Sequence, residues 1–390
     1  MRRIATIAWG AAAVAALLLS SCTTERESPT PLLPAPSPSP SPSETTDPDA
    51  GPVQPVGEAT SIASGLTTPW SIVFVENGSA LISERDTALV KERTAAGGIR
   101  EVGRVADVVP GGEGGLLGLT ILADGGTSAN ASDGPGHPWL YAYFTASGDN
   151  RIVRMPLRGE AGGYTLGPAE TVLTGLAKAG THNGGRIDFG PDGMLYATVG
   201  DAGRPERSQD PGSLNGKILR MTPTGAAPVD NPIPGSVVYS LGHRNPQGIA
   251  WDADGQLWAS EFGQNTWDEL NRIHAGANYG WPLIEGVGDS PGFVNPEYQW
   301  STAEASPSGL EFTRGTFLLA SLRGQRVWAI YDRQQVEAVP HFEGQFGRIR
   351  DVAAAPDGTL WILTSNTDRG IPREGDDQII QVQLAPITAG

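Results

Sequence analysis

Short segments in which apolar and polar residues alternate recur along the chain. Between Gly248 and Ser260 the alternation runs on both sides of the dipeptide Asp254-Gly255. A period of two is typical of a strand with one buried face, and Asp-Gly favours the tight turn between two such strands. The pattern therefore predicts a β-hairpin.

This hairpin pattern occurs four times, each time around an Asn-Gly or Asp-Gly turn. The segments are PWSIVFVENGSALISERD from Pro69, GRIDFGPDGMLYATVGD from Gly185, PQGIAWDADGQLWASEFG from Pro246 and IRDVAAAPDGTLWILTSN from Ile349. Their turn glycines are 115, 62 and 103 residues apart, at Gly78, Gly193, Gly255 and Gly358. These separations correspond to two, one and two units of a period of about 50 residues, which is typical of a β-propeller.

Two further segments fit the gaps between these hairpins. One is LLGLTILAD from Leu116 with WLYAYFTA from Trp139, whose turn carries an insertion, and the other begins at Gly309. We therefore expect an all-β fold, a six-bladed propeller of four-stranded antiparallel blades with long loops at one end. At most a short helix is expected, over residues 267–273. A two-sheet sandwich is the alternative, although it does not explain one hairpin that repeats at a blade-like period.

The amino terminus has the features of an export signal. Arg2 and Arg3 precede an apolar stretch that ends in Leu19-Ser20-Ser21-Cys22, which is similar to a bacterial lipobox. The stretch is too short to predict a membrane span. We expect residues 1–21 to be a lipoprotein signal peptide, and Cys22 to be lipidated and to anchor the protein at the outer face of the cell membrane. The alternative is an ordinary signal peptide with a chance cysteine.

Residues 22–56 consist largely of Pro, Ser, Thr and acidic residues and offer almost nothing to bury. This composition predicts a disordered and extended tether. At about 3.1 Å per residue, the tether could hold the body of the protein on the order of 100 Å from the membrane. The propeller is accordingly expected over residues 57–390.

Composition and charge narrow the choice of partners. The net charge is −16, and it becomes −18 when Arg2 and Arg3 leave with the signal, which argues against nucleic acid as a partner.

The 52 glycines, 32 prolines and 18% charged residues indicate many turns and few amphipathic helices. The single cysteine excludes an intrachain disulfide, and none of the five histidines has the spacing of a zinc site.

Polar residues lie in the loops that flank the hairpins. Arg244 and Asn245 precede the hairpin at Pro246, and Glu269, Asn271 and Tyr279 follow it. A guanidinium and an amide near a carboxylate and a phenol suit an anionic ligand that is held together with a hard cation. The alternative is that these are ordinary loop residues.

A second pair of cations precedes the last hairpin. Arg348 and Arg350 are two positions apart, so a strand would place both on one face. That face could line the channel of the propeller, or the two arginines could pair with Asp351 and Asp357.

Several longer motifs resemble a known family. HNGGR…GPDG…GD.G, GHRNPQG, E…DELN…NYGWP and GRIRDV…PDG resemble, in their order, the soluble pyrroloquinoline quinone (PQQ)-dependent sugar dehydrogenases, or glucose/sorbosone dehydrogenase family. The resemblance runs from about Ile62 to about Val382, and the tether together with GQNTWDELN looks like an actinobacterial lipoprotein branch. It implies a six-bladed propeller and PQQ- and Ca²⁺-dependent oxidation of a sugar or sugar-like alcohol or aldehyde at the cell envelope.

The resemblance also implies roles for single residues in catalysis and cofactor binding. His182 matches the base that takes the proton of the substrate hydroxyl as hydride passes to the quinone, and Asp201 matches the carboxylate that orients this histidine. Arg244 and Asn245 match residues beside the quinone carbonyls. Further residues matched to cofactor binding are Arg348 and Arg350, together with Arg323, which falls where the family has a lysine.

Calcium ligands follow from the same resemblance. Gly263 and Gln264 would give backbone carbonyls to Ca²⁺, an ion that polarises the quinone. Glu269 and Tyr279 match residues that support the ion site.

The chain departs from the glucose-oxidising members of the family at three positions. Phe262 falls where they have a glutamine, Gln264 replaces a proline, and Glu113 falls where they have a glutamine that contacts the substrate. Glucose is therefore not implied as the substrate. The alternative function is a non-catalytic propeller lipoprotein that binds a glycan or an envelope partner.

The lipobox-like segment generates a prediction about anchoring. Replacement Cys22→Ala removes the thiol that would carry the lipid, so the variant should leave the membrane fraction for the soluble fraction. Fractionation of cells that express either form measures this. Equal partitioning of the two forms would contradict the anchor.

Overall fold

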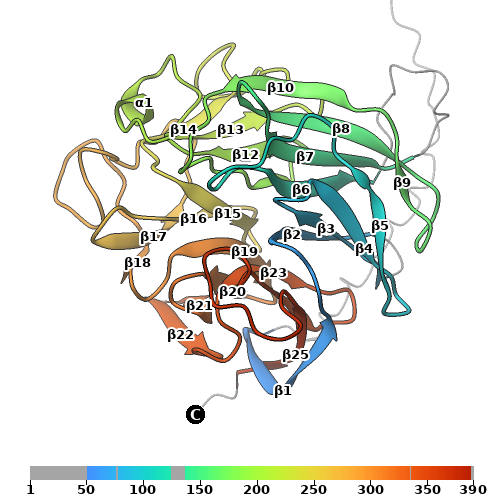
Figure 1. Cartoon of the computed structure of the whole chain (residues 1–390). Helices are drawn as coiled ribbons and strands as arrows, with labels where there is room; N and C mark the ends of the chain where they lie inside the picture. The colour runs from blue at the N-terminus through green and yellow to red at the C-terminus, as the bar shows by residue number, and fades with distance from the viewer. Residues whose placement is uncertain (1–50, 76–77, 124–136, 334, 388–390) are drawn as a thin grey trace, which may run out of the picture. The chain divides into compact units, whose positions relative to one another are not determined.

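The computed structural model describes residues 51–75, 78–123, 137–333 and 335–387 (Figure 1). These residues belong to one unit of the chain, Asp47–Gly390. The predicted signal peptide and Cys22 lie outside the described residues, as does the tether up to residue 50. Within the described ranges, no helix has the length and apolar character needed to cross a membrane.

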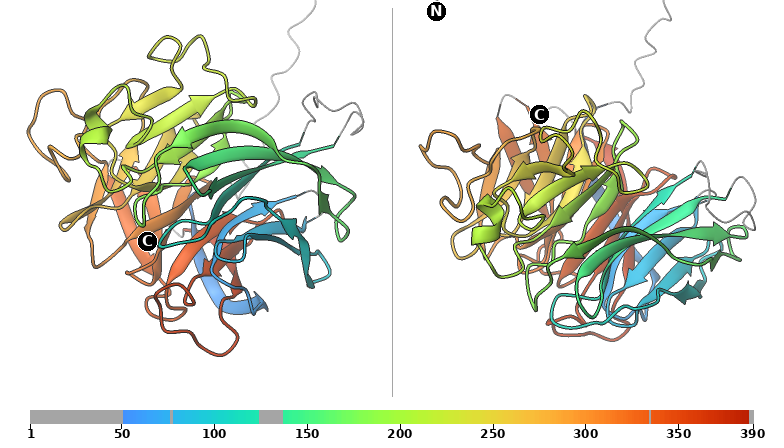
Figure 2. Two further views of the ribbon diagram at one scale, coloured as in Figure 1. Left: turned by 45° about the horizontal axis from the view of Figure 1, so that its top comes forward. Right: turned by 90° about the horizontal axis from the view of Figure 1, so that it is seen from above.

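The described residues form six antiparallel sheets that are arranged as the blades of a ring, which confirms the predicted six-bladed β-propeller (Figures 1 and 2). Blade one contains β2 (Pro69–Phe74), β3 (Ala80–Glu84), β4 (Leu89–Arg93) and β5 (Ile99–Arg104). Blade two contains β6 (Leu116–Leu122), β7 (Trp139–Thr145), β8 (Asn150–Arg158) and β10 (Glu170–Leu176), with the short β9 (Thr165–Leu166) added to β8. Blade three contains β11 (Ile187–Phe189), β12 (Leu195–Val199), β13 (Lys217–Met221) and β14 (Val238–Leu241), and the short α1 (Glu206–Gln209) lies between β12 and β13.

The remaining blades follow the same order along the chain. Blade four contains β15 (Pro246–Trp251), β16 (Leu257–Glu261), β17 (Trp267–Arg272) and β18 (Tyr298–Ser301). Blade five contains β19 (Pro307–Thr313), β20 (Thr316–Ser321), β21 (Arg326–Asp332) and β22 (Val336–His341). Blade six contains β23 (Ile349–Ala354), β24 (Leu360–Thr364), β25 (Ile379–Pro386) and, from the other end of the chain, β1 (Val53–Ala63).

The ring closes because β1 pairs with β25, from Val53 opposite Pro386 to Ala63 opposite Ile379. Thr316 in blade five adds to this closure, since its hydroxyl accepts from Val53 N (2.7 Å) and donates to Val53 O (2.9 Å). The predicted boundary at residue 57 is therefore wrong: the propeller already includes residues 53–56. These residues, Val53-Gln54-Pro55-Val56, continue directly from the tether in the sequence, but pairing with an otherwise open edge strand orders them.

The expected short helix over residues 267–273 is also wrong, because residues 267–272 form β17. This strand is paired on both sides, with Glu269 opposite Glu261 of β16 and opposite Gln299 of β18. Two ladders of backbone hydrogen bonds outweigh the weak helical preference of a six-residue segment.

The apolar core lies between neighbouring blades. One cluster joins Leu81 and Val90 of blade one to Leu116 and Leu140 of blade two. Leu81, Leu116 and Leu140 come from segments that predicted strands, so this part of the core follows from the sequence pattern, whereas Val90 comes from β4, which the pattern did not single out.

The first hairpin of each blade determines where the loops lie. In blade four Pro246, at the start of β15, pairs with Glu261, at the end of β16. The loop before the first strand and the loop after the second strand therefore lie at the same end of the blade. Loops of these two kinds, from several blades, form the site described next.

Candidate active site

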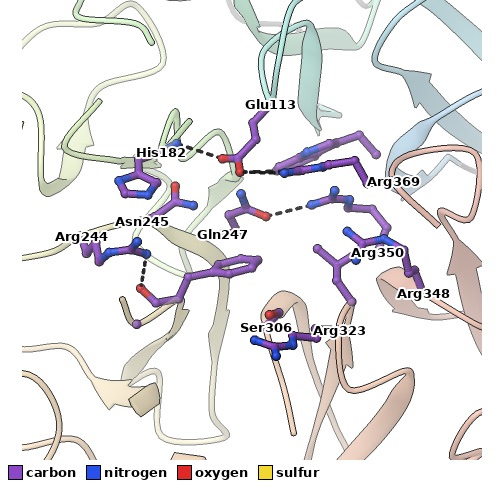
Figure 3. Close-up of a pocket in the computed structure, with 14 residues that line it drawn as sticks. Glu113, His182, Arg244, Asn245, Gln247, Ser306, Arg323, Arg348, Arg350 and Arg369 are labelled. Carbon is purple, nitrogen blue, oxygen red and sulfur yellow. Dashed lines mark hydrogen bonds and ion pairs between the residues drawn. The ribbon is translucent and has the colours of Figure 1, made fainter. Parts of the chain in front are cut away.

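A cavity of about 290 Å³ lies among these loops (Figure 3). Its lining is rich in arginine and comes from the six blades and the loops that join them. The lining residues are Trp70, Glu113, His182, Arg244, Asn245, Gln247, Phe262, Gly263, Ser306, Leu322, Arg323, Arg348, Arg350 and Arg369. In Figure 3, His182, Arg244 and Asn245 lie on one side, Arg348, Arg350 and Arg369 on the other, and Glu113 between them.

His182 forms a hydrogen-bonded pair with Asp201. The His182 Nδ1 and Asp201 Oδ1 atoms are 2.8 Å apart, and the Asp201 side chain is fully buried. Because an ionised carboxylate only accepts hydrogen bonds, Nδ1 carries the proton and Nε2 is left as the basic nitrogen. The structure thus joins these two predicted residues, which are 19 positions apart in the chain.

The backbone around His182 is held in an unusual conformation. His182 has a φ of 57°, in the left-handed region that costs a non-glycine residue about 1–2 kcal/mol. Its N–H donates to Glu113 Oε2 (2.9 Å) and its carbonyl accepts from Ala202 N (3.0 Å). Gly200 permits this approach, because a Cβ at that position would lie 2.1 Å from the His182 carbonyl oxygen. These contacts fix the position of the imidazole at the cavity wall.

Arg244 and Asn245 lie beside His182, and Glu261 holds the backbone of both residues. The Glu261 carboxylate accepts from the backbone N–H groups of both residues and from His243 Nδ1 (2.8 Å). The guanidinium of Arg244 donates to the Phe262 carbonyl (3.2 Å). Burial lowers the pKa of Arg244, so an anion placed in the cavity would stabilise its charge.

Arg348 and Arg350 both line the cavity, as the channel interpretation predicted. The alternative pairing is wrong: Asp351 pairs with Arg186 (2.9 Å), and the Asp357 side chain accepts from Thr359 and Gln381. A bulge between Ile349 and Asp351 interrupts the strict alternation of β23 at this point. Burial lowers the pKa values of Arg348 and Arg350.

Asp368 is the carboxylate that pairs with Arg350, and the spacing of Arg348 and Arg350 in the sequence gave no indication of it. It pairs with Arg350 (3.1 Å), with Arg85 of blade one (2.8 Å) and with Arg369 (3.3 Å). Burial by itself would raise the pKa of Asp368, but these guanidinium groups lower it to about 2. Two of these arginines have a second carboxylate partner, since Arg85 also pairs with Asp86 (2.8 Å) and Arg369 with Glu113 (3.4 Å).

Glu113 joins the two sides of the cavity. Its Oε2 accepts from His182 N, and its Oε1 lies 3.4 Å from the guanidinium nitrogens of Arg369. Arg323 is an exposed member of the cavity lining. The structure therefore brings Glu113 and all of the predicted catalytic and cofactor residues to one cavity, with Asp201 directly behind His182.

The predicted metal residues divide into two groups. Gly263 lines the cavity, whereas Gln264 is exposed at its edge; Asp268 and Glu285 accept from their backbone N–H groups at 2.9 and 2.7 Å. Glu269 and Tyr279 line a smaller neighbouring cavity, which Gly263 and Arg244 also border. Burial is the main cause of the raised pKa of Glu269, and the charge of the nearby Glu261 raises it further.

The hydroxyl of Tyr279 is already engaged within its own loop, donating to Arg272 O (2.5 Å) and accepting from His274 N (2.9 Å). Across the described ranges of the chain, no group of three or more His, Cys, Asp or Glu side chains is arranged to hold a metal ion. A cation at Gly263 would therefore depend on backbone carbonyls and on oxygen atoms from outside the protein.

Sequence reasoning missed several lining residues, among them Gln247 and Arg369, which contact Arg350 and Glu113. Gln247 Oε1 accepts from Arg350 (2.9 Å). Arg369 follows β24 as Gly200-Asp201 follows β12, so comparison of the loops after each second strand could have identified it. Trp70 carries no such signal, because it is one of several buried tryptophans.

The fold and this cavity define a class: six-bladed propellers with a histidine–carboxylate pair among arginines at one end of the ring. A profile of the family described as "Glucose / Sorbosone dehydrogenase" matches residues 66–373. The chain belongs to this family, as the motifs predicted.

Solved structures and curated relatives agree with this assignment. The structure titled "PQQ-bound form of Aldose Sugar Dehydrogenase (Adh) from Streptomyces coelicolor" is 47% identical with a TM-score of 0.76, covering 85% of this chain and 100% of that one. The aldose sugar dehydrogenase YliI of Escherichia coli is 28% identical, over 77% of this chain and 88% of its own. Quinoprotein glucose dehydrogenase B of Acinetobacter calcoaceticus is 31% identical, over 61% of this chain and 55% of its own.

The Asp368 cluster generates a prediction about stability and pH. The pKa of Asp368 is about 2 in the folded protein, against an ordinary value of 3.8. A lowered carboxyl pKa stabilises the fold above pH 4, and this contribution is lost as the pH falls from 4 through 2. At 1.36 kcal/mol per pKa unit it amounts to about 2 kcal/mol.

The Asp368→Asn variant should therefore lose about 2 kcal/mol less than the unmodified protein between pH 4 and pH 2. Urea unfolding across this range measures the difference. Asp289→Asn makes the same charge change at an exposed position and should follow the unmodified protein. Parallel curves for all three proteins would contradict the prediction.

Proposed function

We propose that this protein binds PQQ and Ca²⁺ in the arginine-lined cavity and oxidises a sugar or sugar-like alcohol or aldehyde, with His182 as the base. The family assignment supports sugar oxidation, and the solved Streptomyces coelicolor relative is a PQQ-bound aldose sugar dehydrogenase. The observation that carries the proposal is the set of arginine nitrogens around the cavity.

Three of these nitrogens are buried without a protein partner. The Nε atoms of Arg244, Arg348 and Arg350 have no hydrogen-bond acceptor among the described residues. A buried donor without an acceptor costs about 1–3 kcal/mol, so the cavity favours a ligand with several acceptor atoms. PQQ carries several carboxylates as well as quinone carbonyls, and these groups match the chemistry of the three guanidinium groups.

The histidine–carboxylate pair performs the proton transfer in this proposal. The chemistry that PQQ supplies when bound is acceptance of a hydride from the substrate carbon. His182 Nε2 takes the hydroxyl proton of the same substrate, since Nδ1 is occupied by Asp201. Asp201 then stabilises the imidazolium that forms, and Arg244 contributes positive charge beside the reacting atoms.

The carbonyl groups of Gly263 and Gln264 would hold the calcium ion. Ca²⁺ takes six to eight oxygen ligands, so two carbonyls require further donors from the cofactor and from water. Gly263 is suited to this place because a Cβ there would lie 1.8 Å from the Trp267 carbonyl oxygen, which no other residue could tolerate. The loop is also braced by Glu285, which accepts from the backbone N–H groups of residues 264–267.

Glu113 is the proposed substrate contact and differs in charge from the glutamine of glucose-oxidising members. Its carboxylate is held by His182 N and by Arg369, at the point where the two sides of the cavity meet. We propose that the protein acts at the cell envelope, where the Cys22 anchor would hold it. The supporting observation for this location is the lipobox-like sequence.

The role of His182 generates a kinetic prediction. His182→Ala removes the base, and general-base catalysis typically contributes about 10²–10⁴-fold, so kcat should fall within this range while PQQ affinity is retained. Steady-state kinetics on reconstituted protein measures the loss. His274→Ala, at an exposed position outside the cavity, serves as the control. Near-normal turnover of the His182 variant would remove this residue from the mechanism.

The arginine wall generates a binding prediction. Charge-assisted contacts contribute roughly 1.5–3 kcal/mol each, so Arg348→Gln/Arg350→Gln should weaken PQQ by about 10²–10⁴-fold, at 1.4 kcal/mol per decade. Calorimetric titration of PQQ into apoprotein with Ca²⁺ measures this, with a melting curve alongside. Arg104→Gln/Arg204→Gln makes the same charge change at two exposed arginines outside the cavity.

Two outcomes would count against the proposal. Intact PQQ affinity with a lowered melting temperature would make Arg348 and Arg350 structural. No PQQ binding by the unmodified protein would retire the enzyme proposal and leave a propeller that binds a glycan or an envelope partner.

A further inference from the structure

Trp281 contacts two polar residues that support the proposed reaction, Asp201 and Arg244. Its indole Nε1 donates to Asp201 Oδ2 (2.9 Å), the oxygen that faces away from the His182 hydrogen bond. Its ring also lies 5.5 Å from the guanidinium carbon of Arg244, within the range of a cation–π contact. The tryptophan belongs to the motif NYGWP, and the sequence alone gave it no role in the site.

The surrounding loops fix Trp281 at both of its backbone groups. Its N–H donates to the Gly242 carbonyl (3.0 Å), and its carbonyl accepts from Gln209 Nε2 (2.7 Å). Gln209 is in turn held by a paired amide contact with Asn278, at 3.0 and 2.8 Å. Gly242 permits this close packing, because a Cβ there would lie 2.1 Å from Asn278 Oδ1. The loop of blade four is thereby held against the loop of blade three that carries Asp201.

We propose that Trp281 is a positioning residue for the base: it fixes the Asp201 carboxylate, which fixes the His182 imidazole. This inference rests on the proposed function. Asp201 Oδ1 accepts from His182 Nδ1 and from Gly203 N (2.7 Å), whereas Trp281 Nε1 is the side-chain donor on Oδ2. The carboxylate is fully buried, so no water can replace a lost donor without rearrangement.

The physical consequence of losing the indole N–H is a carboxylate with one oxygen unsatisfied. Rotation of the Asp201 side chain toward other donors would relieve this, and the hydrogen bond to His182 would lengthen or misalign. The other charged groups near His182 are Glu113, whose carboxylate accepts its backbone N–H, and Arg244 in the cavity wall. Neither can hold the imidazole ring, because neither bonds to Nδ1.

Trp281→Phe separates positioning from packing, because it keeps a ring beside Arg244 and removes only the donor and part of the volume. Trp328→Phe is the matched control: Trp328 is similarly buried, lies 5.2 Å from an arginine, and its Nε1 has no hydrogen-bond partner within the described residues. Both variants lose the same atoms from a buried ring.

The first measurement uses apoprotein, so it does not depend on PQQ or on turnover. The Nδ1 proton of His182 should give a downfield imidazole resonance in ¹H–¹⁵N spectra of the full chain, assigned by its loss in His182→Gln. In Trp281→Phe this resonance should shift upfield or broaden, while Trp328→Phe leaves it in place.

The second measurement is kinetic: Trp281→Phe should lower kcat about tenfold, equivalent to about 1.4 kcal/mol, with KM and PQQ affinity within twofold.

The outcomes distinguish this inference from the proposed function. An unchanged His182 resonance in Trp281→Phe would overturn the inference, as would equal effects of the two Trp→Phe substitutions on kcat. If the unmodified protein shows no turnover with PQQ, the proposed function fails, and the resonance still decides whether Trp281 positions the pair.

Discussion

The pairing of β1 with β25 is the interaction on which the rest of the structure depends. It joins the first and last strands of the described residues in blade six and places blade six beside blade one. Arg85 of blade one reaches Asp368 of blade six only because the ring is closed, and Asp368 in turn pairs with Arg350. A propeller without this closure would expose two sheet edges and would separate the charges of the arginine wall.

Within the closed ring, the cavity concentrates charge that the protein does not fully satisfy. Burial lowers the pKa values of Arg244, Arg348 and Arg350, and their Nε atoms lack acceptors among the described residues. The fold tolerates these groups because Asp368, Glu261 and the backbone supply part of the compensation. An anionic ligand would supply more, so the site favours binding at some expense in stability.

The base side of the cavity depends on support from residues that touch no ligand. His182 is held by Asp201, and Asp201 by Trp281, while Glu261 and the buried His243 hold the backbone of Arg244 and Asn245. Asp201, His243 and Trp281 lie in three different loops of blades three and four, and Glu261 ends β16. The same logic explains the glycines at 200, 242 and 263, where backbone segments approach too closely for a side chain.

The sequence by itself determined the blades, because alternating apolar positions and Asn-Gly or Asp-Gly turns are local signals with a fixed period. It also determined the principal polar residues of the cavity, since motifs such as HNGGR and GHRNPQG are contiguous. Only the tertiary structure decided that residues 53–56 close the ring, that 267–272 form a strand, and that Arg350 pairs with Asp368 rather than Asp351 or Asp357. Trp281 as the donor to Asp201 belongs to the same group. These features arise from contacts between loops and strands far apart in the chain, and no local pattern encodes the partner that closes such a contact.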